Sequence, residues 1–306
     1  MRNLSQATAW SSARRSRAVT APTGRAGYFA QCDNANPNGK LAGTAFFGGP
    51  ESTGPFDGLQ AERARIPYAN TTLVRLPHEV SDEQALPISD IFPTGWFGAK
   101  LAEVSEGDTV AVFGCGPVGQ FAIISAFLQG ASRVLAVDAI PDRLEAARSH
   151  TAEVIDFEAE DPVEAIRRLT GGIGVDKAID AVGVDATSPD AGPAASSDHD
   201  EQSAQALRWA VDALAKAGTL AIIGVYSPEL QSFPIGQAFN KNLTLRMGNC
   251  NHRRYVPELV ELVRTGAVDP STALTNIDGV TDAISAYRAF DERQPGRLKV
   301  KLEPTA

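Results

Sequence analysis

The chain has 306 residues, of which 43% are hydrophobic and 21% are charged, and its net charge is −9 at pH 7. This composition is typical of a globular protein with room for about two domains. The negative charge argues against nucleic acid or an anionic membrane surface as a partner, and no apolar run approaches the roughly 18 residues that span a bilayer. Three widely separated cysteines, Cys32, Cys115 and Cys250, favour reduced thiols and a cytoplasmic location.

The first 26 residues differ in composition from the rest of the chain. They are rich in Arg, Ser and Ala, and no acidic residue occurs before Asp33. An organellar transit segment has this composition, and so does a disordered basic tail. A wrong start or a shifted reading frame would also produce a segment foreign to the fold. We expect residues 1–26 to be unstructured.

Residues 27–76 are rich in Gly, Pro and Asn, which are turn signals. Two pieces within them, 58–69 and 72–77, have the composition of short strands, so this part of the chain predicts an irregular β domain. Ser81 is expected to cap a short helix. A longer helix is expected from about Thr94 to Val104.

Beyond residue 107, short apolar strands alternate with helices. The expected strands are 108–114, 133–138, 153–157, 175–183, 218–225 and 242–248. The expected helices between them are 116–131, 140–150, 161–172 and 203–218. This alternation is typical of βαβ units in a parallel, doubly wound sheet covered by helices on both faces. The predicted fold class is therefore α/β with a Rossmann-type sheet.

A G-x-G-x-x-G motif, formed by Gly114, Gly116 and Gly119, links the first strand to the first helix. The first glycine permits a tight turn, the second lets backbone approach a pyrophosphate, and the third lets the helix pack closely on the strand. The helix has Pro117 and Val118 in its first turn and presents N–H groups and a positive dipole end to phosphates. The motif in this context predicts a dinucleotide site, and a turn with incidental glycines is the less favoured alternative.

The next strand ends in Asp138, where an acid would accept hydrogen bonds from the adenosine ribose. An acid here repels a 2′-phosphate, so NAD is favoured over NADP. Arg143 begins the following helix and either reaches the ribose or faces solvent. Cys115, inside the glycine turn, is interpreted as a small buried filler in preference to a redox site.

Five longer segments carry a resemblance to a known family. They are SDIFPTGWFGA, VAVFGCGPVGQFAI, GGIGVDKAIDAVGVDA, FPIGQAFNKNLTLRMGNCNHRRYVPELVELVR and LKVKLEP. These segments resemble the zinc-dependent medium-chain alcohol dehydrogenases, and among them the glutathione-independent formaldehyde dehydrogenases and dismutases. The resemblance implies an NAD-binding Rossmann domain at 93–248. It also implies a partial GroES-like catalytic domain built from 27–92 and 249–306.

The resemblance further implies roles for individual residues. Asp90 corresponds to one ligand of the catalytic zinc, although without the resemblance it is better interpreted as a cap of the following helix. Thr94 resembles a threonine that contacts the nicotinamide, Val118 a residue packed behind that ring, and Lys299 a base near the pyrophosphate. The implied chemistry is hydride transfer from an alcohol or an aldehyde hydrate to NAD, with zinc as a Lewis acid.

The sequence departs from the family where the metal would be held. The family's Cys-bearing and His-bearing ligand segments have no counterpart in this sequence. Cys32 matches only the fourth cysteine of the family's structural zinc lobe, and one sulfur does not make a tetrahedral thiolate site. We therefore expect a 5′-truncated or frame-disrupted relative, with incomplete zinc sites at Asp90 and Cys32.

The predicted function is an NAD-dependent oxidoreductase that acts on a small alcohol or aldehyde. We expect its activity to be impaired by the loss of zinc ligands, and we expect a homo-oligomer if the chain folds. A non-catalytic NAD-binding remnant is one alternative, and a zinc-free reductase that positions its substrate over the nicotinamide is another. Cys250 and His252 follow the last strand and are candidates to line a substrate cleft, with a surface or structural role as the alternative for His252.

Overall fold

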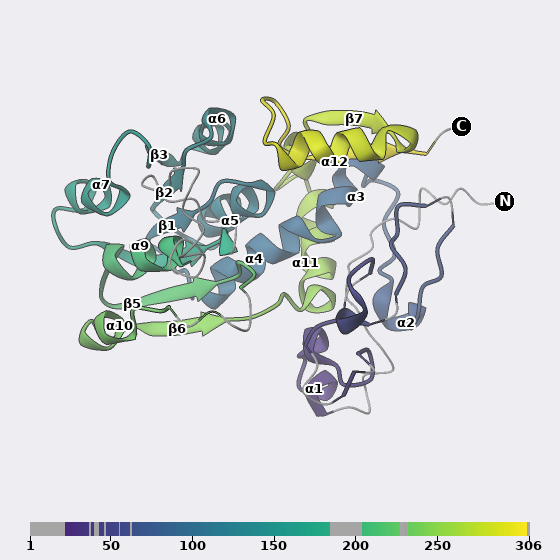
Figure 1. Cartoon of the computed structure of the whole chain (residues 1–306), viewed down its shortest axis with the longest axis horizontal. Helices are drawn as coiled ribbons and strands as arrows, with labels where there is room; N and C mark the ends of the chain where they lie inside the picture. Colours follow the sequence, from purple (N-terminus) through teal and green to yellow (C-terminus); the bar gives the residue numbers. More distant parts are fainter. Residues whose placement is uncertain are drawn as a thin grey trace. The chain divides into compact units, whose positions relative to one another are not determined.

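The computed structural model describes residues 22–36, 38–39, 43–45, 47–54, 56–61, 63–183, 204–226, 230 and 232–304. The chain forms two compact units, unit 1 from Met1–Pro93 with Asn249–Ala306, and unit 2 from Thr94–Gly248. The elements of both are labelled in Figure 1. Most of the segment expected to be unstructured, residues 1–21, lies outside the described residues, and Pro22–Arg25 forms a one-turn helix, α1.

A six-stranded parallel sheet forms the centre of unit 2, which confirms the expected doubly wound fold. Its strands are β1 (Thr109–Phe113), β2 (Arg133–Asp138), β3 (Glu153–Asp156), β4 (Val175–Asp180), β5 (Leu214–Ile222) and β6 (Thr244–Met247). The spatial order is β3-β2-β1-β4-β5-β6, so the strand order reverses between β1 and β4. Sheets of this kind bind ligands outside the carboxyl ends of their strands at that point.

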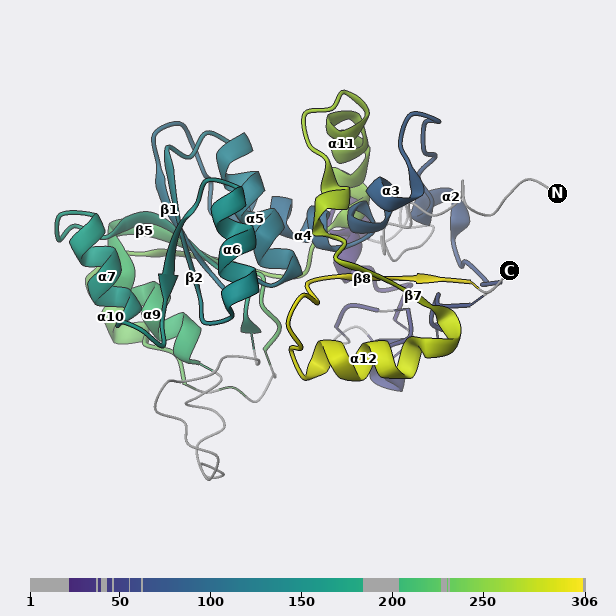
Figure 2. The same cartoon turned by 90° about the horizontal axis from the view of Figure 1, so that it is seen from above.

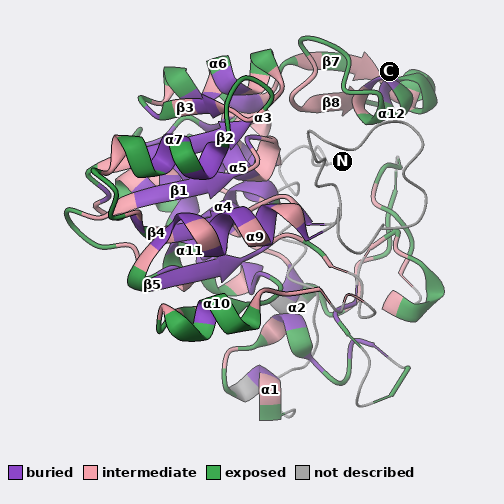
Figure 3. Ribbon diagram, turned by 60° about the vertical axis from the view of Figure 1, so that its left-hand side comes forward, coloured by how far each residue is buried: buried purple, intermediate pink, exposed green. Residues whose placement is uncertain are grey.

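Helices cover both faces of this sheet, with α4, α5 and α6 on one face and α7 and α9 on the other (Figure 2). The helices are α4 (Ile91–Leu101), α5 (Pro117–Leu128), α6 (Pro141–Ser149), α7 (Pro162–Leu169), α9 (Gln205–Ala213) and α10 (Ile235–Asn240). Residues Val110–Phe113 of β1 and Val134–Val137 of β2 are apolar and buried, as expected for strands covered on both faces, and Figure 3 shows these strands buried.

Helix α9 ends earlier than the sequence predicts. The pattern predicted a helix over 203–218, but α9 ends at Ala213 and β5 begins at Leu214. The Lys241 ammonium donates hydrogen bonds of 2.8–2.9 Å to three carbonyl oxygens at this point, those of Val211, Asp212 and Leu214. A cation that binds the last carbonyls stabilises a helix C-terminus. This tertiary contact outweighs the helix propensity of the alanine-rich sequence that follows.

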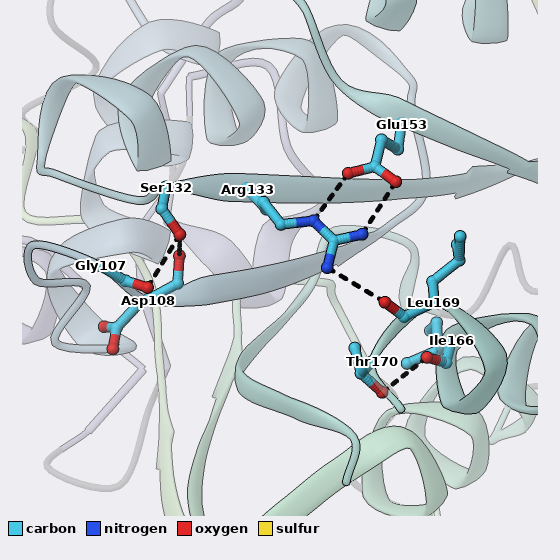
Figure 4. A network of polar contacts seen from close by, with 8 residues as sticks. All are labelled: Gly107, Asp108, Ser132, Arg133, Glu153, Ile166, Leu169 and Thr170. Carbon is cyan, nitrogen blue, oxygen red and sulfur yellow. Dashed lines mark hydrogen bonds and ion pairs between the residues drawn. The ribbon is translucent and has the colours of Figure 1, made fainter. Parts of the chain in front are cut away.

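An ion pair joins β2, β3 and α7 at the amino ends of the strands (Figure 4). Arg133 donates from Nε and Nη2 to the two carboxylate oxygens of Glu153, at 2.8 and 2.9 Å. Its Nη1 donates to the carbonyl oxygen of Leu169 at 3.1 Å. Both charged residues begin their strands, so this contact lies at the edge of the sheet opposite to the carboxyl ends.

In its described residues, unit 1 consists of short helices joined by turns and extended chain. Besides α1, its helices are α2 (Ala69–Thr72), α3 (Asp82–Ile88), α11 (His252–Arg264) and α12 (Ala283–Asp291), with 3-10 turns at Phe29–Gln31, Glu51–Thr53, Pro270–Ala273 and Val280–Asp282. Its sheet has two parallel strands, β7 (Asn276–Gly279) and β8 (Val300–Glu303). Among all helices that the structure describes, none is long and apolar enough to cross a bilayer.

The prediction of strands at 58–69 and 72–77 is wrong for the described residues of those pieces. They form bends, turns, extended chain and helix α2. A strand needs a neighbour that satisfies its backbone N–H and C=O groups, and the structure pairs neither piece with a strand.

The predicted cap at Ser81 is confirmed. The Ser81 hydroxyl accepts a hydrogen bond from the Gln84 amide at 3.2 Å, and the Gln84 side chain accepts one from the Ser81 amide at 3.1 Å. This reciprocal pair fixes the start of α3. The longer helix expected from Thr94 begins three residues earlier, at Ile91, so Asp90 immediately precedes α4.

Candidate functional site

The glycine turn after β1 has the close backbone packing that the motif predicts. Gly114 has a φ of +86°, and a Cβ there would meet the Val182 side chain at 2.7 Å. A Cβ on Gly119 would overlap the carbonyl oxygen of Gly114. Glycine is therefore required at both positions, first for the turn and then for the contact between α5 and the end of β1.

Gly116 and Pro117 begin helix α5. Gly116 is its N-cap residue and Pro117 its first helical residue, so the helix starts directly from the turn. A Cβ on Gly116 would lie 3.7 Å from Nη1 of Arg143, which places that guanidinium beside the turn. The backbone N–H groups of the first helical turn have no carbonyl one turn earlier, and the dipole is positive at this end. The residues present therefore fit a pyrophosphate.

Asp138 is buried at the carboxyl end of β2 and binds the glycine turn directly. Its Oδ2 accepts a hydrogen bond from the Cys115 amide at 2.7 Å, and its Oδ1 accepts from the amides of Ala139 and Ile140 at 2.8 and 2.9 Å. Arg143 Nη1 lies 3.9 Å from Oδ2. The structure thus brings Asp138 and Arg143 together beside the turn, and Arg143 does not simply face solvent.

Gln120 is a residue of this site that the sequence analysis missed. Its Nε2 donates to the carbonyl oxygens of Cys115, at 2.7 Å, and of Arg143, at 2.9 Å, so it joins the turn to α6. The sequence feature that could have identified Gln120 is its position directly after Gly119, the last glycine of the motif. Burial and the Asp138 carboxylate both raise the pKa of the Cys115 thiol well above its usual range, which agrees with its interpretation as a buried filler.

The nicotinamide candidates Thr94 and Val118 are half-buried residues of unit 2. Thr94 lies in the first turn of α4 and Val118 in the first turn of α5. A Cβ on Gly95 would overlap the backbone of Phe121 and Ala122, so the two helices are in direct contact here. The structure therefore places both candidates on adjacent helices.

A second buried acid, Asp180, lies at the carboxyl end of β4 and was also missed. Its Oδ1 accepts from the amides of Val182 and Gly183, at 2.9 and 3.4 Å, and its Oδ2 accepts from the Tyr226 hydroxyl at 2.7 Å. Burial raises the pKa of the Asp180 carboxyl, and these hydrogen bonds partly offset the rise. Burial and the neighbouring acid raise the pKa of the Tyr226 hydroxyl far above its usual range. The sequence feature that could have identified Asp180 is its position as an acid at the end of an apolar strand.

In unit 1, Asp90 and His252 form a pair. His252 Nε2 and Asp90 Oδ1 are 2.8 Å apart, with the imidazole 8% exposed and the carboxylate 57% exposed. His252 begins α11, and the residue before it, Asn251, accepts a hydrogen bond from the Ala30 amide at 2.9 Å. The structure thus joins two of the predicted catalytic residues, and His252 is a buried residue, not a surface one.

Lys299 lies in the same unit, just before β8. Burial lowers the pKa of its ammonium, and the negative charge of Asp90 partly offsets that effect. Asp90 and His252 are the candidate polar pair of unit 1.

The described residues do not fit the family's zinc sites. Within the described ranges, no three His, Cys, Asp or Glu side chains gather so as to hold a metal ion. Cys32 is buried in an apolar cluster with Ala35 and Ala45. The Cys250 thiol donates to the carbonyl oxygen of Pro93 at 3.3 Å. The arrangement offers Asp90 a histidine partner but not a tetrahedral set of ligands.

The chain is similar to several known proteins. Residues 117–196 match the family model described as zinc-binding dehydrogenase. The uncharacterized zinc-type alcohol dehydrogenase-like protein AdhB of Bacillus subtilis is 38% identical over 279 residues, which cover 90% of this chain and 73% of that protein. An alcohol dehydrogenase of Cupriavidus necator is 36% identical over 254 residues, 81% of this chain and 63% of that protein.

The fold is also similar to that of solved structures. Alcohol dehydrogenase TADH from Thermus sp. ATN1 superimposes with a TM-score of 0.78 at 31% sequence identity, covering 94% of this chain and 76% of that one. The chain thus spans between 63% and 76% of the length of these three proteins.

Proposed function

This chain belongs to the zinc-type alcohol dehydrogenase family, and from that membership we propose that it binds NAD and transfers a hydride to it from a small alcohol or an aldehyde hydrate. The observation that carries the NAD proposal is the bond between the Asp138 carboxylate and the Cys115 amide in the glycine turn. That hydrogen bond holds a buried acid beside the turn that would receive the pyrophosphate of NAD. NAD, when bound, supplies the hydride acceptor.

Three parts of unit 2 would hold the cofactor. The N-terminus of α5 and the backbone at Gly116 would bind the pyrophosphate. Asp138 would accept hydrogen bonds from the hydroxyls of the adenosine ribose, and Arg143, whose Nη1 lies 3.9 Å from that carboxylate, would contact the same ribose. An acid at this position favours NAD over NADP because it repels a 2′-phosphate.

We propose that turnover by this chain is very low. The family reaction depends on a zinc ion that lowers the pKa of the substrate hydroxyl, and the described residues offer Asp90 without a tetrahedral ligand set. Asp90 and His252 stay our candidates for the substrate site, and Thr94 stays our candidate for contact with the nicotinamide.

Several finer features are part of the same proposal. Unit 1 corresponds to a partial GroES-like domain, and the substrate preference follows the formaldehyde dehydrogenase branch that the motifs resemble. The three cysteines are buried thiols, which supports the proposal of a cytoplasmic setting. We expect a homo-oligomer.

The decisive experiment combines three measurements on the purified full chain. NADH binding is followed by its fluorescence, zinc is counted by mass spectrometry, and NAD reduction is assayed with formaldehyde and with short alcohols. We expect NADH to bind more tightly than NADPH, zinc to stay far below one per chain, and turnover to be very low. Stoichiometric zinc with ordinary turnover contradicts the impairment, and failure to bind NADH contradicts the cofactor proposal.

A further inference from the structure

The carboxyl ends of β4 and β5 are tied together by a single buried acid. Asp180 is fully buried, and it pairs in register with Phe113 of β1 and with Ile222 of β5. Its side chain accepts hydrogen bonds from the amides of Val182 and Gly183, in the segment that follows β4, and from the Tyr226 hydroxyl, in the segment that follows β5. One carboxylate thus fixes the backbone that leaves two neighbouring strands.

The backbone of the same carboxyl end completes this connection. The Asp180 carbonyl oxygen accepts hydrogen bonds from the amides of Ile223 and Gly224, both at 3.0 Å. Gly183 has a φ of +76°, and a Cβ there would meet the backbone of Val225 at 2.5 Å. The segments that follow β4 and β5 are therefore in van der Waals contact, without room for a side chain between them. We call this segment pair, residues 181–183 and 223–226, the β4–β5 shelf.

The shelf lies next to the glycine turn. Val182 of the shelf fills the space where Gly114 would carry a Cβ, and the Ala181 amide donates to the carbonyl oxygen of Phe113 at 2.9 Å. The strand order reverses between β1 and β4, so the turn and the shelf lie on the two sides of the reversal point. A dinucleotide bound in such a sheet lies across that point, with one nucleotide on each side.

The two sides are built differently. On the β2 side, Asp138 also accepts three backbone hydrogen bonds, but it keeps 6% of its surface exposed and has the Arg143 guanidinium 3.9 Å from its Oδ2. On the β4 side, the Asp180 carboxylate is enclosed and its oxygens are used by Val182, Gly183 and Tyr226. What this side presents at the carboxyl edge is the backbone that Asp180 and Tyr226 hold in place.

We propose that Asp180 and Tyr226 are positioning residues for the nicotinamide ring of NAD, because their hydrogen bond fixes the β4–β5 shelf on which that ring lies. The inference rests on the proposed binding of NAD. It predicts that the pair contributes to the affinity for the complete dinucleotide and not to the affinity for ADP-ribose, which keeps both riboses and lacks only the ring. A purely structural pair would affect both ligands equally.

The test is Tyr226→Phe, measured with two probes, NADH and ADP-ribose, which lacks the nicotinamide. The variant keeps the aromatic ring in the core and removes only the hydroxyl that Asp180 binds. We expect NADH affinity to fall by about tenfold, because a hydrogen bond to a charged group is lost. ADP-ribose affinity is expected to stay within about twofold. Equal losses for the two probes, or no loss for NADH, would overturn the proposal.

The matched control is Glu153→Gln, which breaks the Arg133 ion pair at the opposite edge of the same sheet. It weakens unit 2 without touching the shelf, so both affinities should equal those of the unmodified chain. A selective loss of NADH affinity in this control would mean that any destabilisation of the sheet produces the effect, and the proposal would fail.

Hydrogen exchange on the unmodified chain gives a second measurement that does not depend on the variant folding. NADH should slow exchange of the amides of Val182, Gly183, Ile223 and Gly224 more than ADP-ribose does. Equal protection by the two ligands would contradict the proposal. If the unmodified chain binds ADP-ribose but not NADH, or neither, the proposed function fails together with this inference, whereas NADH binding with an unaffected Tyr226→Phe variant removes the inference alone.

Discussion

Gly119 lies so close to the carbonyl oxygen of Gly114 that no side chain fits between helix α5 and the turn after β1. Gly119→Ala should therefore lower the free energy of unfolding by about 1–3 kcal/mol, through overpacking against backbone, and should weaken NADH binding by displacing the helix N-terminus. Gly236→Ala in α10 is the control, because a Cβ there meets nothing within 4 Å and alanine is the better helix former. Thermal unfolding and NADH titration of both variants check this, and an unimpaired Gly119→Ala protein would contradict it.

Asp138→Ala should lower both stability and NADH affinity. The change leaves the amides of Cys115, Ala139 and Ile140 without their carboxylate partner. The Cys115 hydrogen bond is buried, and a buried unsatisfied donor costs about 1–3 kcal/mol. Removal of the acid should also narrow the preference for NADH over NADPH.

The control for Asp138→Ala is Asp156→Ala, at the matching end of β3. Its carboxylate accepts a hydrogen bond from the amide of Glu158 on an exposed turn. Titrations with NADH and NADPH should separate the two variants. Similar nucleotide affinities in both would show that Asp138 has no direct part in binding the ribose.

The Asp90–His252 pair should contribute a modest coupling energy. Because the carboxylate is 57% exposed, solvent screens the interaction, and we expect about 0.5–1 kcal/mol. A double-mutant cycle with Asp90→Asn and His252→Gln, followed by urea unfolding, measures this energy directly. Strictly additive effects of the two substitutions would show that the pair does not couple.

His150 should make stability depend on pH. Burial lowers the pKa of its imidazole, so the unfolded chain binds a proton more readily than the folded chain. Above about pH 6.5 His150 is neutral in both states and does not reduce the free energy of unfolding. As the pH falls toward the lower folded-state pKa, the unfolded chain takes up the proton first, so the free energy of unfolding decreases. His150→Gln should flatten the dependence between pH 7 and pH 5 in urea unfolding experiments. An unchanged slope would assign the dependence to other groups.

The sequence predicts best those parts of the site that are local in the chain. Gly114, Gly116 and Gly119 lie within six residues. A strand comes before them and a helix after them, and that context makes the motif predict a dinucleotide site. The same local pattern identified Asp138 as the end of the next strand. The unit 2 sheet was predictable for the same reason, since each strand is a short apolar run between helices.

The remaining site contacts could not be predicted because they join distant residues. Asp180 and Tyr226 are 46 positions apart, and Asp90 and His252 are 162 positions apart. No periodicity or spacing rule connects such pairs. The wrong strands at 58–69 and 72–77 have a related cause, because a strand forms only where another segment supplies its partner.

The hydrogen bond from the Ala30 amide to Asn251 spans 221 positions of the chain. During synthesis, the segment that ends at Pro93 therefore leaves the ribosome long before its partner segment exists, whereas Thr94–Gly248 is continuous. At about 5–20 residues per second, the delay is roughly 10–40 s. For that time the early part of unit 1 has only the contacts within itself, such as the Cys32–Ala35–Ala45 cluster, and lacks those that residues 249–304 supply. Its apolar surface is then open to chaperones and proteases.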